Sequence, residues 1–232
     1  MDRNSNSYIL IYVAVMVVIV AFVLAFTAGA LKERKERNVE IDKKRQILTA
    51  LNIESTARNA EALFEQYVKE IIVVNYKGEL VEGIAGFTIE LAIEQRRSAE
   101  ERLLPIYIAE KDGETFYVFS LFGAGLWGPI WGYIALEADR NTVYGAHFSH
   151  KAETPGLGSE IADRHFQELF QGKEIFKEGV FRSVAVIQPG KPAVEGIDFV
   201  DGISGGTITS HAVDRMIFNN LAWYKPFLKS NN

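Results

Sequence analysis

The stretch LPIYIAEKDGETFYVFSLF, residues 104–122, has the pattern of two strands joined by a tight turn. Aliphatic and aromatic residues fill Leu104–Ala109 and Thr115–Phe122, and such residues are enriched in strands. EKDG lies between these runs and puts Asp112 and Gly113 at the tip, a dipeptide that favours hairpin turns. The sequence therefore predicts an antiparallel hairpin here.

The same pattern continues on both sides of this hairpin. Ile130–Glu137 and Thr142–Ser149 flank Asp139-Arg140-Asn141 and predict a second hairpin. The other expected elements are strands at 70–75 and 180–187 and helices at 55–69, 159–171 and 207–224. Strands paired in hairpins, with helices between and around them, indicate an α+β fold: an antiparallel β-sheet domain with surrounding helices.

A long apolar segment lies near the N-terminus. Tyr8–Leu31 contains no charged residue and would span roughly 36 Å as a helix, enough to cross the core of a bilayer. A cleavable signal peptide would use Ala28 and Ala30 as its cleavage site, but the run exceeds the usual apolar region of about 7–15 residues. We therefore expect one retained N-terminal transmembrane helix that anchors the chain in a membrane.

The charged residues after this segment define the rest of the expected organisation. We predict a short N-terminus and anchor at 1–31, a charged helical stalk at 32–54 and a folded domain at 55–232. Lys32–Arg37 holds four basic residues, whereas only Arg3, beside Asp2, precedes the span. By the positive-inside rule, this asymmetry alone would leave the folded domain in the cytoplasm.

Composition excludes several classes of function. A net charge of −5 gives no support for binding nucleic acid. The absence of cysteine excludes disulfides, cysteine-ligated iron–sulfur clusters, thiolate zinc sites and cysteine nucleophiles. The four histidines have no metal-binding spacing, and Ser210 lies in no GxSxG motif. We therefore expect neither a metal site nor catalytic residues in this chain.

Two glycine-rich segments lie in the middle of the chain. GAGLWG, residues 123–128, matches the dinucleotide pattern GxGxxG, but Pro129 and an apolar strand follow in place of the required helix. A glycine-rich bend that presents the face of Trp127 fits better. In HKAETPGLGSE, residues 150–160, a Pro155–Gly156 turn would leave backbone N–H groups free for a ligand, with Glu153 and Thr154 at its lip. The alternative for this segment is an ordinary loop.

A third segment, DGISGGTITSHAVDRM, spans residues 201–216. Glycines and hydroxyl residues stand here directly before an amphipathic helix. The unpaired N–H groups and the dipole at the start of a helix form a natural seat for phosphate. The alternative is simple helix capping by Ser204 or Thr207.

Together, these segments resemble a known family. DGISGGTITS resembles the S/T-G-A-T flavinylation motif of the FMN-binding domain family, and ETPGLG and GLWG resemble two further signatures of that family. With one span and a charged stalk, the chain is similar to the C subunits of sodium-translocating NADH:quinone reductases. It departs from the motif at Gly206, where the family usually has alanine.

The resemblance implies a flavin site. Thr207 would bear FMN through a phosphoester bond, which would make the chain a phosphoprotein, and a separate flavin transferase would attach the FMN by reading the context of Asp201–Gly202. Glu153 would place negative charge near the flavin and lower its potential. The remaining site residues fall into two sets. Those that would approach the phosphate are Ser204, Gly205 and Gly206, and those that would line the flavin ring are Leu126, Trp127, Thr154, Gly156, Leu157 and Gly158.

The function implied by the resemblance is electron transfer through covalent FMN within a larger membrane complex. That complex would oxidise NADH, reduce ubiquinone and translocate sodium ions, with those three sites in partner subunits. The resemblance places the chain in the cell inner membrane as a single-pass protein with its main domain on the periplasmic side, against the charge rule. The alternatives are the G subunit of the Rnf electron-transport complex, which shares the domain, and a non-redox extracytoplasmic binding or scaffold module.

Overall fold

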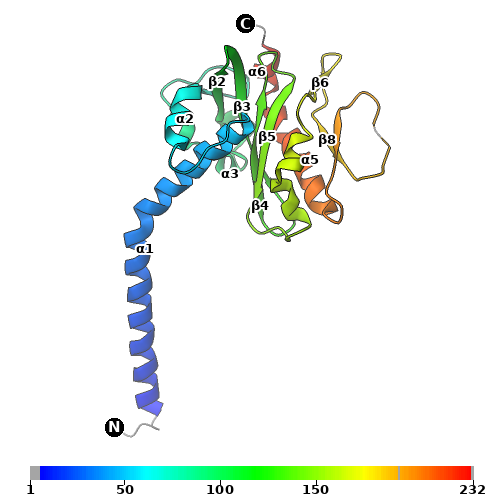
Figure 1. Ribbon diagram of the computed structural model, residues 1–232. Coiled ribbons are helices and arrows are strands. Elements are labelled where there is room, and N and C mark those ends of the chain that lie inside the picture. Colours follow the sequence, from blue (N-terminus) through cyan, green and yellow to red (C-terminus); the bar gives the residue numbers. More distant parts are fainter. Residues whose placement is uncertain (1–5, 193, 231–232) are drawn as a thin grey trace. The chain divides into compact units, whose positions relative to one another are not determined.

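The computed structural model describes residues 6–192 and 194–230, so Asp2 and Arg3 lie outside the described residues. The chain divides into an N-terminal helical unit that ends at Lys43 and a compact unit that begins at Lys44 (Figure 1).

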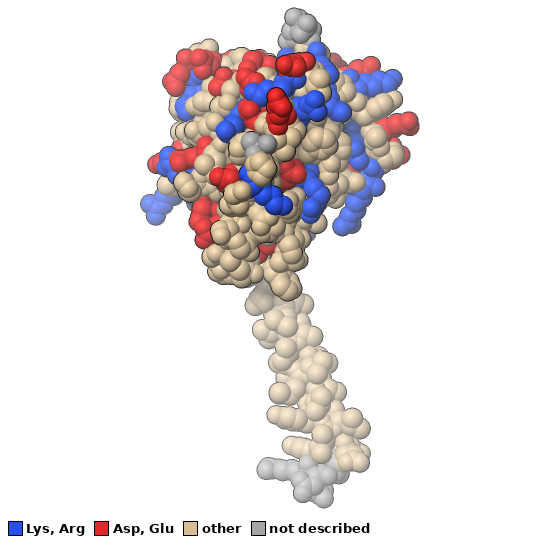
Figure 2. All heavy atoms as spheres, turned by 90° about the vertical axis from the view of Figure 1, so that its right-hand side faces the viewer, with Lys and Arg blue, Asp and Glu red and all other residues tan. Residues whose placement is uncertain are grey.

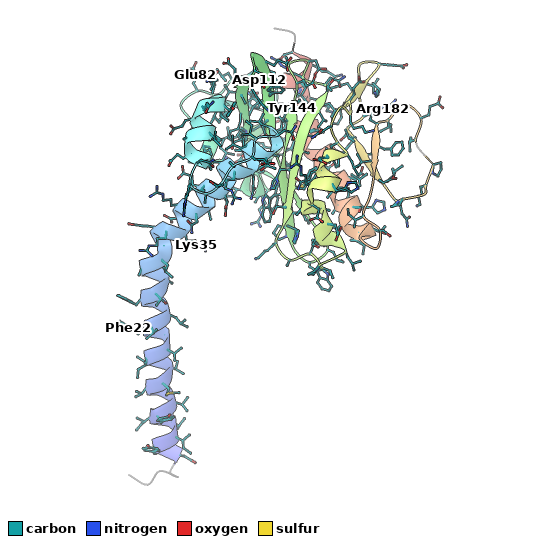
Figure 3. The ribbon with its side chains drawn as sticks, viewed as in Figure 1. Phe22, Lys35, Glu82, Asp112, Tyr144 and Arg182 are labelled. Atoms are coloured by element: carbon teal, nitrogen blue, oxygen red, sulfur yellow. The ribbon has the colours of Figure 1, made fainter. Side chains whose placement is uncertain are left out.

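Helix α1 (Asn6–Ala50) makes up the described part of the first unit, and its last residues, from Lys44 on, belong to the compact unit. Its most apolar window has a mean hydropathy of 3.2, and none of that window is buried, so by length and composition this helix can cross a membrane. Phe22 points outward from it (Figure 3), and its apolar part carries no Lys, Arg, Asp or Glu (Figure 2). The apolar segment and the charged segment that follows it thus form one continuous helix, as the sequence predicts.

The compact unit is built on a five-stranded sheet. Its strands are β1 (Val68–Val74), β2 (Leu104–Lys111), β3 (Glu114–Ala124), β4 (Pro129–Leu136) and β5 (Val143–His150). They lie in sequence order, and each is antiparallel to the next. Asp112 and Gly113 have positive φ angles of 54° and 85°, as a two-residue hairpin turn requires, and Asp112 lies at the tip of the β2–β3 hairpin (Figure 3). Both predicted hairpins and the α+β class are confirmed.

Helices cover both faces of this sheet. Helix α5 (Thr207–Trp223) packs on one face, where Phe119, Ile134 and Ile217 belong to one buried cluster. The other face carries Tyr107, whose ring meets Phe64 of α2 (Ala60–Tyr67) edge-on. Because side chains of a strand alternate between faces, apolar residues are needed at nearly every position of β2, β3 and β4.

The predicted helix at 159–171 is wrong as one element. It consists of a 3₁₀ turn, η3 (Gly158–Ala162), and helix α4 (Arg164–Glu168), with Asp163 extended between them. The buried Gln167 amide donates to the carbonyl oxygens of Phe148 and Ala162, each at 3.0 Å. A continuous helix would have used the Ala162 carbonyl in its own ladder, so docking against β5 replaces helical continuity.

The predicted strand at 180–187 is also divided. β7 (Val180–Phe181) pairs with β6 (Phe176–Lys177), whereas β8 (Ala185–Ile187) pairs in parallel with β9 (Phe199–Asp201). Between them, Ser183 has a φ of 63°, and its N–H donates to the carbonyl oxygen of Ile175. The left-handed backbone at this serine ends one strand and redirects the chain into the other.

One helix boundary also differs from prediction, because helix α2 begins at Ala60 rather than Ser55. The predicted helix at 207–224 is confirmed, since α5 spans Thr207–Trp223. Pro226 lies in the first turn of the separate helix α6 (Lys225–Lys229), where its missing N–H has no partner to lose. The remaining short elements are η1 (Gly86–Thr88), α3 (Leu91–Glu94) and η2 (Ala99–Glu101).

Candidate functional site

The three glycine-rich segments meet at one end of the sheet. Figure 1 shows the β3–β4 turn, the chain after β5 and the start of α5 at the same end of the compact unit. Leu157 from the second segment packs directly on Gly205 of the third, and the backbone nitrogen of Gly158 lies close to Gly206. Residues separated by up to about 80 positions along the chain therefore form one surface.

The first segment is a tight turn between β3 and β4. The Gly125 N–H donates to the Gly128 carbonyl oxygen at 2.8 Å and closes the turn. Leu126 and Trp127 project from it, with 46% and 65% of their surfaces exposed. Strand β4 follows the turn, as the sequence predicts, in place of the helix that a dinucleotide fingerprint requires after its glycines.

The second segment is a loop that satisfies much of its own backbone. The Leu157 N–H donates to the Thr154 carbonyl oxygen at 3.1 Å, and the Gly156 N–H donates to Ser159 Oγ at 3.2 Å. The expectation that these N–H groups are free for a ligand is therefore wrong for Gly156 and Leu157. Gly156 has a φ of 74°, which explains a glycine at this position.

The third segment turns into the first residue of α5. Gly205 has a φ of 75°, and the Gly206 N–H donates to the Ile203 carbonyl oxygen at 3.0 Å. The N-cap is Gly206, which has no side chain to cap the helix, so capping by Ser204 or Thr207 at that position is wrong. Thr207 is half-buried and stands at the first helical position. The start of α5 keeps the uncapped N–H groups that suit an anion.

Hydrogen bonds fix α5 against the sheet. The buried Asn220 side chain accepts from the Phe122 N–H at 2.8 Å and donates to the Phe122 carbonyl oxygen at 3.1 Å. β2 begins at Leu104 and does not extend alongside Phe122, so Asn220 takes the place of a strand partner there. Asp214 accepts from the Val186 N–H at 2.9 Å and ties the same helix to β8.

Glu153 occupies the centre of the site rather than its lip. Only 5% of Glu153 is exposed, whereas Thr154 is exposed as expected. Glu153 Oε1 accepts from the Trp127 N–H at 3.1 Å, and Oε2 accepts from the Thr209 hydroxyl at 2.6 Å. Sequence reasoning missed Thr209, because nothing in a run of several hydroxyl residues distinguishes the one that faces inward.

A cavity of about 470 Å³ lies elsewhere, between the end of α1, β5 and α4. Its lining includes Thr49, Asn52, His147, Arg164, Gln167 and Gln171. None of the predicted site residues, all of which the structure describes, lines it. Within residues 6–192 and 194–230, no group of three or more His, Cys, Asp or Glu side chains is arranged to hold a metal ion.

Comparison with known proteins agrees with this arrangement. The model of the FMN-binding domain family matches residues 125–222, which include most of the first segment and all of the second and third. The C subunit of the Na(+)-translocating NADH-quinone reductase of Vibrio vulnificus strain YJ016 is 28% identical, with 83% of this chain and 82% of the relative covered. The corresponding C subunit of Haemophilus ducreyi is 27% identical over 92% of this chain and 88% of the relative.

Solved structures show the same likeness. The crystal structure of the Na(+)-translocating NADH-quinone reductase C subunit from Parabacteroides distasonis is 48% identical, with a TM-score of 0.82, and covers 87% of this chain and 98% of its own. NqrC of Shewanella oneidensis shares the fold, with a TM-score of 0.68 at 23% identity, over 85% of this chain and 100% of its own.

The hydrogen bonds that hold α5 against the sheet can be tested directly. We expect Asn220→Ala to lower the free energy of unfolding by about 1–3 kcal/mol, because both backbone groups of Phe122 lose their partner. Urea unfolding of the full chain in detergent, followed by tryptophan fluorescence, measures this loss. The neighbouring Asn219→Ala is the matched control, since Asn219 is exposed. Equal stability of the two variants would contradict the role given to Asn220.

Proposed function

The chain belongs to the family of C subunits of the Na(+)-translocating NADH-quinone reductases, and from this premise we propose that it is a membrane-anchored electron carrier with covalently bound FMN. The observation that carries the proposal is the position of Thr207 at the uncapped start of α5, inside the segment matched by the FMN-binding domain model. The named relatives and structures are C subunits, which favours this complex over the Rnf alternative.

Thr207 is proposed as the attachment residue. Its hydroxyl stands on a half-buried side chain at the first position of α5, where N–H groups at the helix start can receive a phosphate. Ser204 and Gly205 are exposed beside it, and Gly205 and Gly206 carry no side chain between the phosphate and the backbone. A threonine hydroxyl is a weak nucleophile without a base, so attachment would require a separate flavin transferase.

The flavin ring is proposed to lie against the exposed apolar side chains around Thr207. Leu126, Trp127 and Leu157 supply these surfaces, and Thr154 and Gly156 border them. Gly158 is buried behind this surface and would shape it from below. FMN, when bound, supplies the redox chemistry, while the chain orients it and Glu153 adds a fixed negative charge that would lower its potential.

The rest of the electron path is assigned to partner subunits. A carrier needs no general acid or base of its own, so we place NADH oxidation, quinone reduction and sodium translocation in the other subunits of the complex. Helix α1 would anchor the chain in the inner membrane by its apolar part, with residues 1–31 as anchor, 32–54 as stalk and 55–232 as the FMN-binding domain.

Loss of the hydroxyl at the attachment residue tests the covalent bond. We expect Thr207→Ala, produced in a host with the flavin transferase, to carry no flavin after denaturation, because no oxygen remains to esterify. Flavin fluorescence of the denatured band and the mass of the tryptic peptide measure attachment. Thr207→Ser keeps a hydroxyl and should retain some flavin. A fluorescent Thr207→Ala band would refute attachment at this residue.

The side of the membrane on which the domain lies needs a separate test. We propose the periplasmic side, although Lys32–Arg37 favours the cytoplasm by charge. A reporter enzyme that is active only outside the cytoplasm, fused after Asn232, is expected to be active. A cytoplasm-specific reporter fused at the same residue is the control and should be inactive. The reverse pair of results would place the domain in the cytoplasm.

A further inference from the structure

We propose that Glu153 is a positioning residue that holds the three segments of the flavin site in register by a two-sided carboxylate clasp. The clasp consists of Glu153, the Trp127 backbone N–H and the Thr209 hydroxyl. This inference rests on the proposed function, because it assigns the clasp to the placement of the residue that takes up FMN. It differs from the charge effect of Glu153, since it depends on hydrogen-bond geometry.

The two carboxylate oxygens serve two different segments. Oε1 accepts from Trp127 in the β3–β4 turn, and Oε2 accepts from Thr209 in the first turn of α5. The Glu153 backbone N–H donates to His150 Nδ1 at 3.1 Å, which also fixes the base of the side chain at the end of β5. The β4–β5 pairing already brings the β3–β4 turn beside the chain after β5, and this buried side chain connects both of them to the first turn of α5.

Two glycines make room for this carboxylate. A Cβ at Gly125 would contact Glu153 Oε1, and a Cβ at Gly158 would lie 2.7 Å from Oε2 and also contact the Thr209 hydroxyl. Gly158 has no positive φ that would demand glycine, so the close approach of the clasp accounts for it. Gly158, which the sequence suggests as a ligand-approach position, thus also serves an internal contact.

The clasp is connected to Thr207 through the first turn of α5. Thr209 lies two residues after Thr207 in the same helical turn, so the bond at 2.6 Å fixes the orientation of that turn. Both donors are neutral, and a buried carboxylate that loses one of them loses part of the hydrogen bonding that replaces its contact with water. We therefore expect the first turn of α5 to shift when the Thr209 hydroxyl is removed.

Two substitutions separate the geometry of the clasp from its charge. Thr209→Val keeps the shape of the side chain and leaves the Glu153 side chain in place but removes the donor. Glu153→Gln removes the charge but keeps both contacts, because its amide can accept from the Trp127 N–H and donate to the Thr209 oxygen. Glu153→Ala removes the charge and both contacts.

The experiment uses the full-length protein, purified without flavin and then incubated with the flavin transferase and FAD. The Thr207 oxygen takes the FMN phosphoryl group as the pyrophosphate bond of FAD breaks, and AMP and the hydroxyl proton are released. We expect Thr209→Val and Glu153→Ala to slow attachment at Thr207 by about tenfold or more. Thr209→Ser should restore the rate, and Glu153→Gln should react within about threefold of the unaltered chain. Once loaded, Glu153→Gln should have a raised midpoint potential, because the carboxylate is gone.

Thr115→Val is the control, since Thr115 lies at the opposite end of β3. If Thr209→Val fails to fold, as judged by thermal unfolding, Gly158→Ala tests the same contact by displacing the carboxylate from Thr209. If whichever of Thr209→Val and Gly158→Ala folds takes up FMN at the normal rate, the positioning role of Glu153 is refuted. A Glu153→Gln rate as low as that of Glu153→Ala refutes it too. No flavin at Thr207 in the unaltered chain would instead refute the proposed function.

Discussion

A carboxylate that is buried must keep hydrogen-bond donors around it, and this requirement applies at the end of the sheet where the three glycine-rich segments meet. Glu153 accepts hydrogen bonds from the β3–β4 turn and from α5. If either element moved, the buried carboxylate would lose a hydrogen-bond donor. The arrangement of the surface around Thr207 follows from this internal contact. The polar group that matters most for the geometry is therefore hidden beneath the site.

The helix that carries Thr207 is held independently at points further along its length. Asn220 replaces a missing strand partner beside β3, and Asp214 bonds the backbone of β8. These contacts place the body of α5, and the bond to Thr209 orients its first turn. A helix fixed in this way can present uncapped N–H groups at a constant position, which is the condition for binding an anion without reorganisation.

Local sequence signals were enough for the hairpins and the long helices. Asp112-Gly113 specifies its turn through φ angles that few other dipeptides adopt, and the apolar run in α1 needs no tertiary information. Prediction failed where a distant contact overrode local preference. The Gln167 amide donates to the Ala162 carbonyl oxygen, which a continuous helix would use for its own hydrogen bonds. The hydrogen-bond partners of Glu153 lie 26 and 56 residues away in the chain, farther than any local sequence pattern extends.

A covalent bond would let FMN stay attached to an exposed surface that does not enclose it. Leu126, Trp127 and Leu157 offer apolar contact on an open surface, whereas the cavity of about 470 Å³ lies among other residues. Ligands held without covalent bonds usually lose most of their surface to a pocket, which an open surface cannot provide. A bond at Thr207 would remove this need, because loss of FMN would then require breaking an ester. The ring could remain accessible to a redox partner, which a deep pocket would prevent.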